Sequence, residues 1–92
     1  MTTSRIYPRI RSVKPMPGKT LLVTFENGDR KVYDCTPLLQ TEAFRALQDE
    51  AIFRCAHADS HGHGVIWNDD IDLAESEIWI NGRIAEQNDA GE

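Results

Sequence analysis

The stretch from Thr20 to Cys35 constrains the fold of this 92-residue chain more than any other. Its first half alternates between apolar and mostly polar residues, which is the period of a strand with one buried face. Asn27-Gly28 follows directly, and this pair tolerates the positive φ angles of a type I′ turn. The stretch therefore predicts a β-hairpin. Its buried face is formed by Leu21, Val23 and Phe25.

A strict two-residue loop sets the register of this hairpin. It pairs Phe25 with Arg30, Val23 with Val32 and Leu21 with Asp34. An acid opposite a buried leucine is unfavourable. Asp34 is therefore expected either at the rim of the sheet, where it caps the turn over Thr36–Leu38, or in a register shifted by a bulge.

The residues before the hairpin predict a third strand. Arg9–Lys14 alternates, with an irregularity at Ser12 that is typical of a bulge, and Pro15–Gly18 predicts a turn. Arg9–Lys14 then pairs with the first hairpin strand. The result is a three-stranded meander over about residues 9–35.

A helical region from about Pro37 to Phe53 is expected next, interrupted near Gln40 and near Asp49. Thr36 and Thr41 are candidate N-caps for its turns. We expect this region to cover one face of the sheet.

A second hairpin is predicted over residues 54–67, with a glycine-rich loop at Ser60–Gly64. Beyond a turn, Asp72 and Glu75 have the spacing of a capping box, which favours a short helix at Leu73–Trp79. The alternative makes residues 77–80 a strand that pairs with residues 83–86 across Asn81-Gly82. We favour the helix.

These elements predict a small α+β fold in a single domain, residues 9–87, with a flexible arm (1–8) and a disordered polar tail (88–92). The chain has 40% hydrophobic and 27% charged residues, as in ordinary globular domains. It contains no apolar run of membrane-spanning length and no apolar signal-peptide core near its start. We expect a bacterial cytoplasmic protein without membrane contact. Its two cysteines, Cys35 and Cys55, are expected to be buried and reduced.

Charge is distributed unevenly. Residues 1–19 contain five of the ten bases and none of the fifteen acids. The bases are Arg5, Arg9, Arg11, Lys14 and Lys19. This segment makes weak nucleic-acid binding an alternative function, but the net charge of −5 disfavours it. Arg9 and Arg11 are also candidate contacts for a protein partner.

Five potential metal ligands occur at alternate positions between Cys55 and His63. Alternate strand residues lie about 6.6 Å apart, so at most two or three of them could share one ion. His57, His61 and His63 would form such a site, which makes metal binding a second alternative. We favour incidental histidines in a loop and expect no cofactor.

No arrangement in the sequence indicates nucleophilic catalysis. Ser60 and His61 are neighbours but lack a glycine-flanked elbow, and Cys55 with His57 lacks a third orienting group. The sequence therefore favours a non-enzymatic protein. Trp67 and Trp79 are expected to pack in the core, and either becomes an interface anchor if it is exposed.

The order and spacing of several short segments resemble the bacterial domain of unknown function 2442 family over about residues 9–80. The segments are Arg9–Pro15, Leu22–Gly28, Val32–Leu39, Phe44–Leu47, Ile52–Phe53 and Ile66–Leu73. The resemblance implies a small α+β domain with no established activity and no catalytic residues to assign. Some members of that family continue into a helix-turn-helix domain, and others are encoded beside a small partner, as toxin–antitoxin pairs are.

Together these observations favour a non-enzymatic interaction or regulatory module, antitoxin-like, whose partner is another small protein. A domain of this size has a small core, so self-association is also compatible with it.

Overall fold

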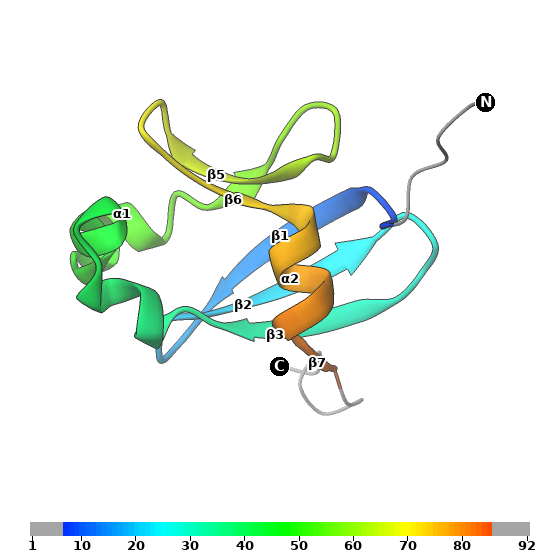
Figure 1. Cartoon of the computed structure of the whole chain (residues 1–92), viewed down its shortest axis with the longest axis horizontal. Helices are drawn as coiled ribbons and strands as arrows, with labels where there is room; N and C mark the ends of the chain where they lie inside the picture. Colours follow the sequence, from blue (N-terminus) through cyan, green and yellow to red (C-terminus); the bar gives the residue numbers. More distant parts are fainter. Residues whose placement is uncertain (1–6, 86–92) are drawn as a thin grey trace.

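The computed structural model describes residues 7–85, which form two antiparallel sheets around one core (Figure 1). The first sheet has the order β1-β2-β3-β7 and the second β4-β5-β6. The strands are β1 (Ile10–Met16), β2 (Thr20–Phe25), β3 (Arg30–Asp34), β4 (His57–Ala58), β5 (Gly64–Asn68), β6 (Ile71–Ala74) and β7 (Arg83–Ile84). The helical elements are the 3₁₀ turns η1 (Thr36–Gln40) and η2 (Glu42–Gln48) and the helices α1 (Glu50–Phe53) and α2 (Glu75–Asn81). The predicted α+β class is confirmed.

The β2–β3 hairpin is present, but its predicted register is wrong by one residue. Leu21 lies opposite Tyr33 and Val23 opposite Lys31. The Phe25 N–H donates to the Asp29 carbonyl at 2.8 Å, so the loop is longer than two residues. Only Gly28 in this loop has a positive φ, 95°, which excludes the type I′ turn expected at Asn27-Gly28.

Asp34 lies at the rim of the sheet and binds the turn that follows, as the first of the two expectations stated. The register is shifted by the longer loop and not by a bulge. The shifted register moves it opposite Thr20 at the end of the hairpin, where it is exposed. Its Oδ1 accepts hydrogen bonds from the backbone N–H of Thr36, at 2.9 Å, and from the Thr36 hydroxyl. These two bonds hold the pKa of Asp34 below its usual value.

The strand β1 pairs with β2 as predicted, and its register shifts between Ile10 and Ser12. It continues through Pro15 to Met16, further than expected, because a proline is tolerated in the outermost strand of a sheet. The turn is therefore confined to residues 17–19. Gly18 and Lys19 both have positive φ there, 81° and 61°.

The helical segment has the two predicted interruptions, at Thr41 and Asp49. Thr41 holds the N-cap position of η2, as predicted, but its hydroxyl donates to the Leu38 carbonyl at 2.7 Å and makes no capping bond. The N-cap of η1 is Cys35, so the prediction is wrong for Thr36, whose hydroxyl binds Asp34. Asp49 instead caps α1 by accepting from the N–H of Ala51 at 2.9 Å. The segment lies at one end of the first sheet (Figure 1). It contributes Leu39, Leu47 and Phe53 to the core.

The second hairpin, β4–β5, is confirmed, but the chain then forms a third strand that was not predicted. Asp72 lies in β6 opposite Ile66, so the expected capping box is wrong. The helix α2 starts at Glu75, with Ala74 as an N-cap that makes no side-chain bond. The favoured helix is thus correct, although it begins two residues late. The alternative predicted a strand over residues 83–86 that pairs with residues 77–80. Residues 83–84 do form a strand, but it pairs with β3.

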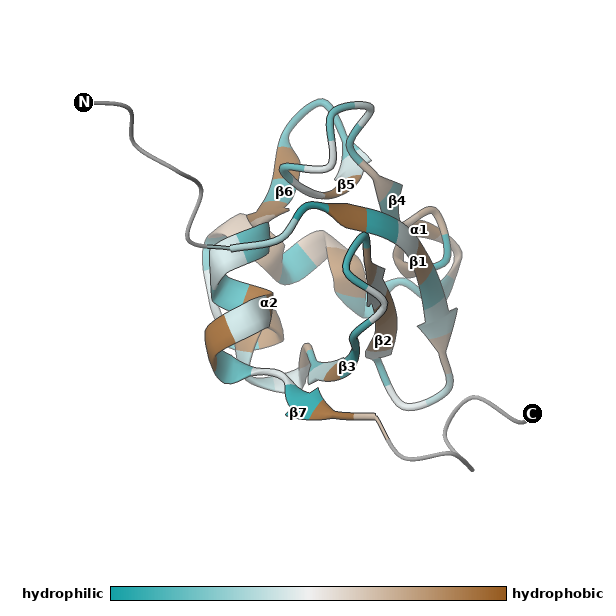
Figure 2. Cartoon of the chain, turned by 90° about the vertical axis from the view of Figure 1, so that its right-hand side faces the viewer, coloured by the Kyte–Doolittle hydropathy of each residue, from teal (hydrophilic) through white to brown (hydrophobic). Residues whose placement is uncertain are grey.

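The core lies between the first sheet, the second sheet and α2. Figure 2 shows α2 on the opposite side of the core from β1 and β2. The first sheet also meets the β4–β5 loop directly, where the N–H of Ile10 donates to the carbonyl of Gly62 at 2.8 Å. The largest fully buried side chains are those of Phe25, Phe53, Leu21, Leu47, Ile78, Val23, Val65 and Cys35.

The predicted arm and tail fall mostly outside the described residues. Tyr7 and Pro8 are the described part of the arm, and both are partly buried. Between residues 7 and 85, no helix has the length and apolar character needed to cross a membrane.

Candidate interaction site

The three histidines named as metal ligands are not brought together. The Nδ1 atom of His57 lies 2.9 Å from the carbonyl oxygen of Cys55, within hydrogen-bond distance. His61 and His63 stack on each other, with ring centroids 5.9 Å apart. No group of three histidine, cysteine or acidic side chains lies close enough to hold an ion anywhere in residues 7–85.

Asp59 organises the histidine loop through the backbone. Its Oδ2 accepts from the N–H of His61 at 2.9 Å and from that of His63 at 3.4 Å. These bonds lower the pKa of Asp59. Gly62 has φ +76° and lies against β1, where an added Cβ would be 2.8 Å from the Cβ of Arg9. The backbone bonds to Asp59 and the packing of Gly62 on β1 thus fix the shape of the loop.

The two cysteines differ in their environments. Cys35 is fully buried, and this burial raises the pKa of its thiol to about 12. Cys55 is exposed, so the prediction that both thiols are buried is wrong for it. It lies two residues after the end of α1, and its Sγ lies 3.5 Å from the carbonyl oxygen of Ala51. Both cysteines are free.

The two tryptophans have different roles. Trp67 is only 3% exposed, and its indole N–H donates to the carbonyl of Phe53 at 3.1 Å, so it is a core residue. Trp79 is partly exposed on α2 and meets Phe25 edge to face, with centroids 5.1 Å apart. Of the two candidate interface anchors, only Trp79 reaches the surface.

The basic residues of the N-terminal segment do not form one patch in the described part of the chain. Arg9 and Arg11 are exposed at the start of β1, and an Nη of Arg11 donates to the carbonyl of Glu26 at 3.2 Å. Lys19 lies beyond the far end of the same strand, where it is bound to Glu50. Arg5 lies outside the described residues.

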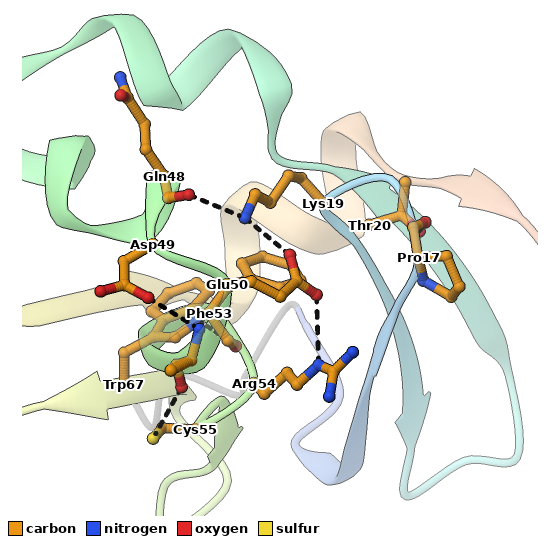
Figure 3. A network of polar contacts seen from close by, with 11 residues as sticks. Pro17, Lys19, Thr20, Gln48, Asp49, Glu50, Phe53, Arg54, Cys55 and Trp67 are labelled. Carbon is orange, nitrogen blue, oxygen red and sulfur yellow. Dashed lines mark hydrogen bonds and ion pairs between the residues drawn. The ribbon is translucent and has the colours of Figure 1, made fainter.

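A first cleft, of about 490 Å³, lies between the β1–β2 turn and α1 and is lined by Pro15, Pro17 and Arg54 among others. Its polar groups bind each other (Figure 3). The Lys19 Nζ is 2.8 Å from Glu50 Oε1 and donates to the Gln48 carbonyl at 3.2 Å. The Arg54 Nε is 3.3 Å from Glu50 Oε2. The charged side chains at this cleft therefore form a structural ion-pair network.

A second cleft, of about 370 Å³, lies where the start of β3 meets α2 and β7. Its walls include Arg30, Lys31, Trp79 and Ile84. The Lys31 Nζ sits 4.5 Å from the centroid of the Trp79 ring and donates to the Trp79 carbonyl at 2.6 Å. A cation held over an indole is stabilised by the ring quadrupole. This contact fixes both side chains at the edge of the cleft.

The helix α2 is held in place beside this cleft by Glu77. The Tyr33 hydroxyl donates to Glu77 Oε2 at 2.8 Å, and the Asn81 side-chain amide donates to the same oxygen at 2.9 Å. Burial and the adjacent Glu77 carboxylate raise the pKa of Tyr33, so the hydroxyl keeps its proton and remains a donor. The wall formed by Trp79 is therefore preorganised.

Two large apolar side chains are exposed at or near the second cleft, and they are the ones exposed within residues 7–85. Ile84 is 75% exposed and Ile80 is 61% exposed. Neither isoleucine was identified from the sequence. Helical phase could have indicated Ile80, because residues two apart on a helix point in nearly opposite directions and Ile78 is in the core.

The fold and this surface define a small α+β protein with an apolar, partly basic cleft at the edge of a sheet. The chain belongs to the family described as protein of unknown function DUF2442, whose profile matches residues 10–83. No curated protein and no solved structure gives a significant match to the chain.

Proposed function

We propose that this protein is a non-enzymatic interaction module of the bacterial cytoplasm that binds another small protein, as an antitoxin or a regulatory subunit does. The contact surface is the second cleft together with Ile80 and Ile84. A single observation carries the proposal. Two large apolar side chains, 61% and 75% exposed, occur within five residues of each other beside a cleft with a partly exposed tryptophan in its wall.

The physical reason is the cost of exposed apolar area. Each large apolar side chain that is removed from water at an interface contributes about 1.5–3 kcal/mol when it is fully buried. Aromatic side chains in preformed pockets are the usual anchors of such interfaces. Trp79 meets this description because Phe25, Lys31 and the helix bearing it hold its ring in place.

The first cleft supports a binding role less well. Its charged side chains already pair with each other, so a ligand would have to break those bonds before forming its own. The second cleft presents cations that make no ion pair with any residue from 7 to 85, namely Arg30 and Lys31.

Affinity purification of the tagged chain from its own host, followed by mass spectrometry, tests this function. We expect one small protein in near-stoichiometric amount. It should be lost with the double variant Ile80→Asp/Ile84→Asp and retained with Ala43→Asp, a matched change at an exposed position in η2. A chain that purifies alone and monomeric from low to high salt would contradict the proposal.

A further inference from the structure

The strand β7 is the outermost strand of the first sheet among the described residues, next to β3 and α2 (Figure 2). The Ala85 N–H donates to the Arg30 carbonyl at 3.0 Å, which makes Ala85–Arg30 a hydrogen-bonded pair. Hydrogen-bonded and non-bonded pairs alternate along an antiparallel ladder. The next pair, Ile84–Lys31, is therefore non-bonded. The N–H and carbonyl of Ile84 thus point away from β3, toward the outer edge.

The two faces of this edge differ in chemistry. Paired residues share a face and successive residues alternate. Ile84 lies on the same face as Lys31, whose ammonium group covers the Trp79 ring. Arg30 and Arg83 lie on the other face, because Arg83 is paired with Val32. Ile84 and the partly exposed Trp79 thus give the first face its apolar side chains, and Arg30 gives the other face a charge that has no ion pair within residues 7–85.

The one acid that lines the cleft is already bound locally. The Asn27 side-chain amide donates to Asp29 Oδ2 at 3.2 Å, and the Asp29 N–H donates to Asn27 Oδ1 at 2.9 Å. Asp29 therefore belongs to the β2–β3 loop. The electrostatic preference of the edge is for a negatively charged ligand.

We propose that an extended segment of a partner protein adds to β7 as a further strand, and that apolar and acidic residues alternate in this segment. Its apolar side chains contact Ile84 and Trp79, and its carboxylates face Arg30 on the other side. The backbone groups of Ile84 bond to the added strand, which is the mode of peptide recognition called β-augmentation. This inference rests on the proposed interaction function, for which it specifies the chemistry of the partner.

A synthetic probe tests the inference directly. The probe is a fluorescein-labelled decapeptide in which valine and glutamate alternate, and its binding to the full chain is measured by fluorescence anisotropy. We expect saturable binding that weakens as salt rises, because ionic screening shortens the Debye length to about 8 Å at 0.15 M. The same peptide with lysine in place of glutamate should bind at least about tenfold more weakly.

Variants of the chain separate the charge from the backbone contact. Arg30→Glu should weaken binding of the valine–glutamate peptide about tenfold. Arg45→Glu, the same charge change at an exposed position in η2, should leave binding unchanged. Ile84→Pro removes the outward N–H, which β3 does not use, whereas Ile84→Ala keeps it. The proline variant should therefore bind more weakly than the alanine variant at an equal thermal midpoint.

Each outcome decides the inference. Equal binding of the glutamate and lysine peptides, or none up to about 1 mM peptide, overturns it. Concentration-dependent dimers that Ile84→Pro abolishes would assign the edge to a second copy of this chain and would also overturn it. Co-purification of a partner that depends on Ile80 and Ile84 but is unchanged by Arg30→Glu would support the proposed function. That result would overturn only the inference that the partner contributes an extended acidic segment.

Discussion

Lys19 and Lys31 lie toward opposite ends of the β2–β3 hairpin and make similar contacts, yet only Lys19 is ion-paired within residues 7–85. Each ammonium group sits over an aromatic ring, at 5.4 Å from the Phe53 centroid and 4.5 Å from that of Trp79. Each also donates to the carbonyl of a helical residue. Lys19 in addition pairs with Glu50 (Figure 3), whereas Lys31 has no ion pair within residues 7–85.

The difference shows how the same kind of contact can serve stability or recognition. At Lys19, carboxylate, ammonium and guanidinium groups satisfy each other, so the network joins the β1–β2 turn to α1. At Lys31, the cation is held in place by a ring and a carbonyl and lies beside the exposed Ile84. A surface whose side chains are already held in place loses less conformational entropy when a partner binds.

The largest expected effect on stability comes from removing the Trp79 ring at the second cleft. Trp79→Ala deletes the contact with Phe25 and the surface beneath Lys31, and it should lower the free energy of unfolding by about 2–3 kcal/mol. Urea denaturation followed by circular dichroism measures this. Combining the change with Lys31→Met should cost less than the sum of the two single changes, because both remove the same contact. Strict additivity would show that Lys31 and Trp79 are not coupled.

At the first cleft, two substitutions separate the contributions of the Lys19 backbone and side chain to stability. Lys19→Ala loses the bonds to Gln48 and Glu50 but keeps a φ of 61°, so it should destabilise by about 2 kcal/mol. Lys19→Gly loses the same bonds but removes the cost of a left-handed backbone, about 1 kcal/mol. We expect the glycine variant to be the more stable of the two in urea denaturation. Neither change should alter peptide binding at β7.

Removing only the charge of Lys31 at the second cleft should have a smaller effect on stability. Lys31→Met keeps the aliphatic stem on the Trp79 ring and should lower the free energy of unfolding by about 0.5–1 kcal/mol. It should also weaken the valine–glutamate peptide, but less than Arg30→Glu does, because Lys31 lies on the same face of the edge as Ile84. An effect on peptide affinity larger than that of Arg30→Glu would reverse the assignment of the two faces.

The smallest expected effect is the pH dependence of stability that arises from Glu50 at the first cleft. The Lys19 ammonium lowers the pKa of Glu50 the most, and Arg54 adds to this. Because the native pKa lies below the unfolded value of about 4.3, the carboxylate stabilises the fold above that pH, and this is lost as pH falls through the native pKa. The thermal midpoint of Glu50→Gln should thus be lower than that of the parent near pH 7, and the two should converge as the pH falls through the native pKa of Glu50. Glu42→Gln, at an exposed position in η2, is the control. Parallel curves at all pH values would contradict this linkage.

Local patterns predicted much of the fold. The alternation in β2, the bulge at Ser12 and the breaks at Thr41 and Asp49 depend on neighbouring residues alone, and all are present. The loop at Asn27-Gly28 was identified, but its type was not. A turn type depends on the φ of each residue, which the ladder fixes, and a shift of one residue changes every partner.

The candidate site could not be predicted in the same way. The glycines beside the histidines predicted a loop, which is present, but the contact that fixes it, the packing of Gly62 on β1, could not be predicted from the local pattern. The exposure of Ile84 could not be predicted from the sequence, because it follows from pairing with β3, more than fifty residues earlier in the chain. Asp72 and Glu75 had the spacing of a cap, but Asp72 pairs with β5 instead.

The sequence by itself determined the α+β class, the hairpin and the number of breaks in the helical segment, because periodicity and turn residues act over a few positions. Only the tertiary structure decided the register of the hairpin, the strand β6, the pairing of β7 with β3 and the separate environments of Lys19 and Lys31. These features depend on contacts between residues far apart in the chain. Their free energy comes from burial and from hydrogen bonds that exist only once the core has formed.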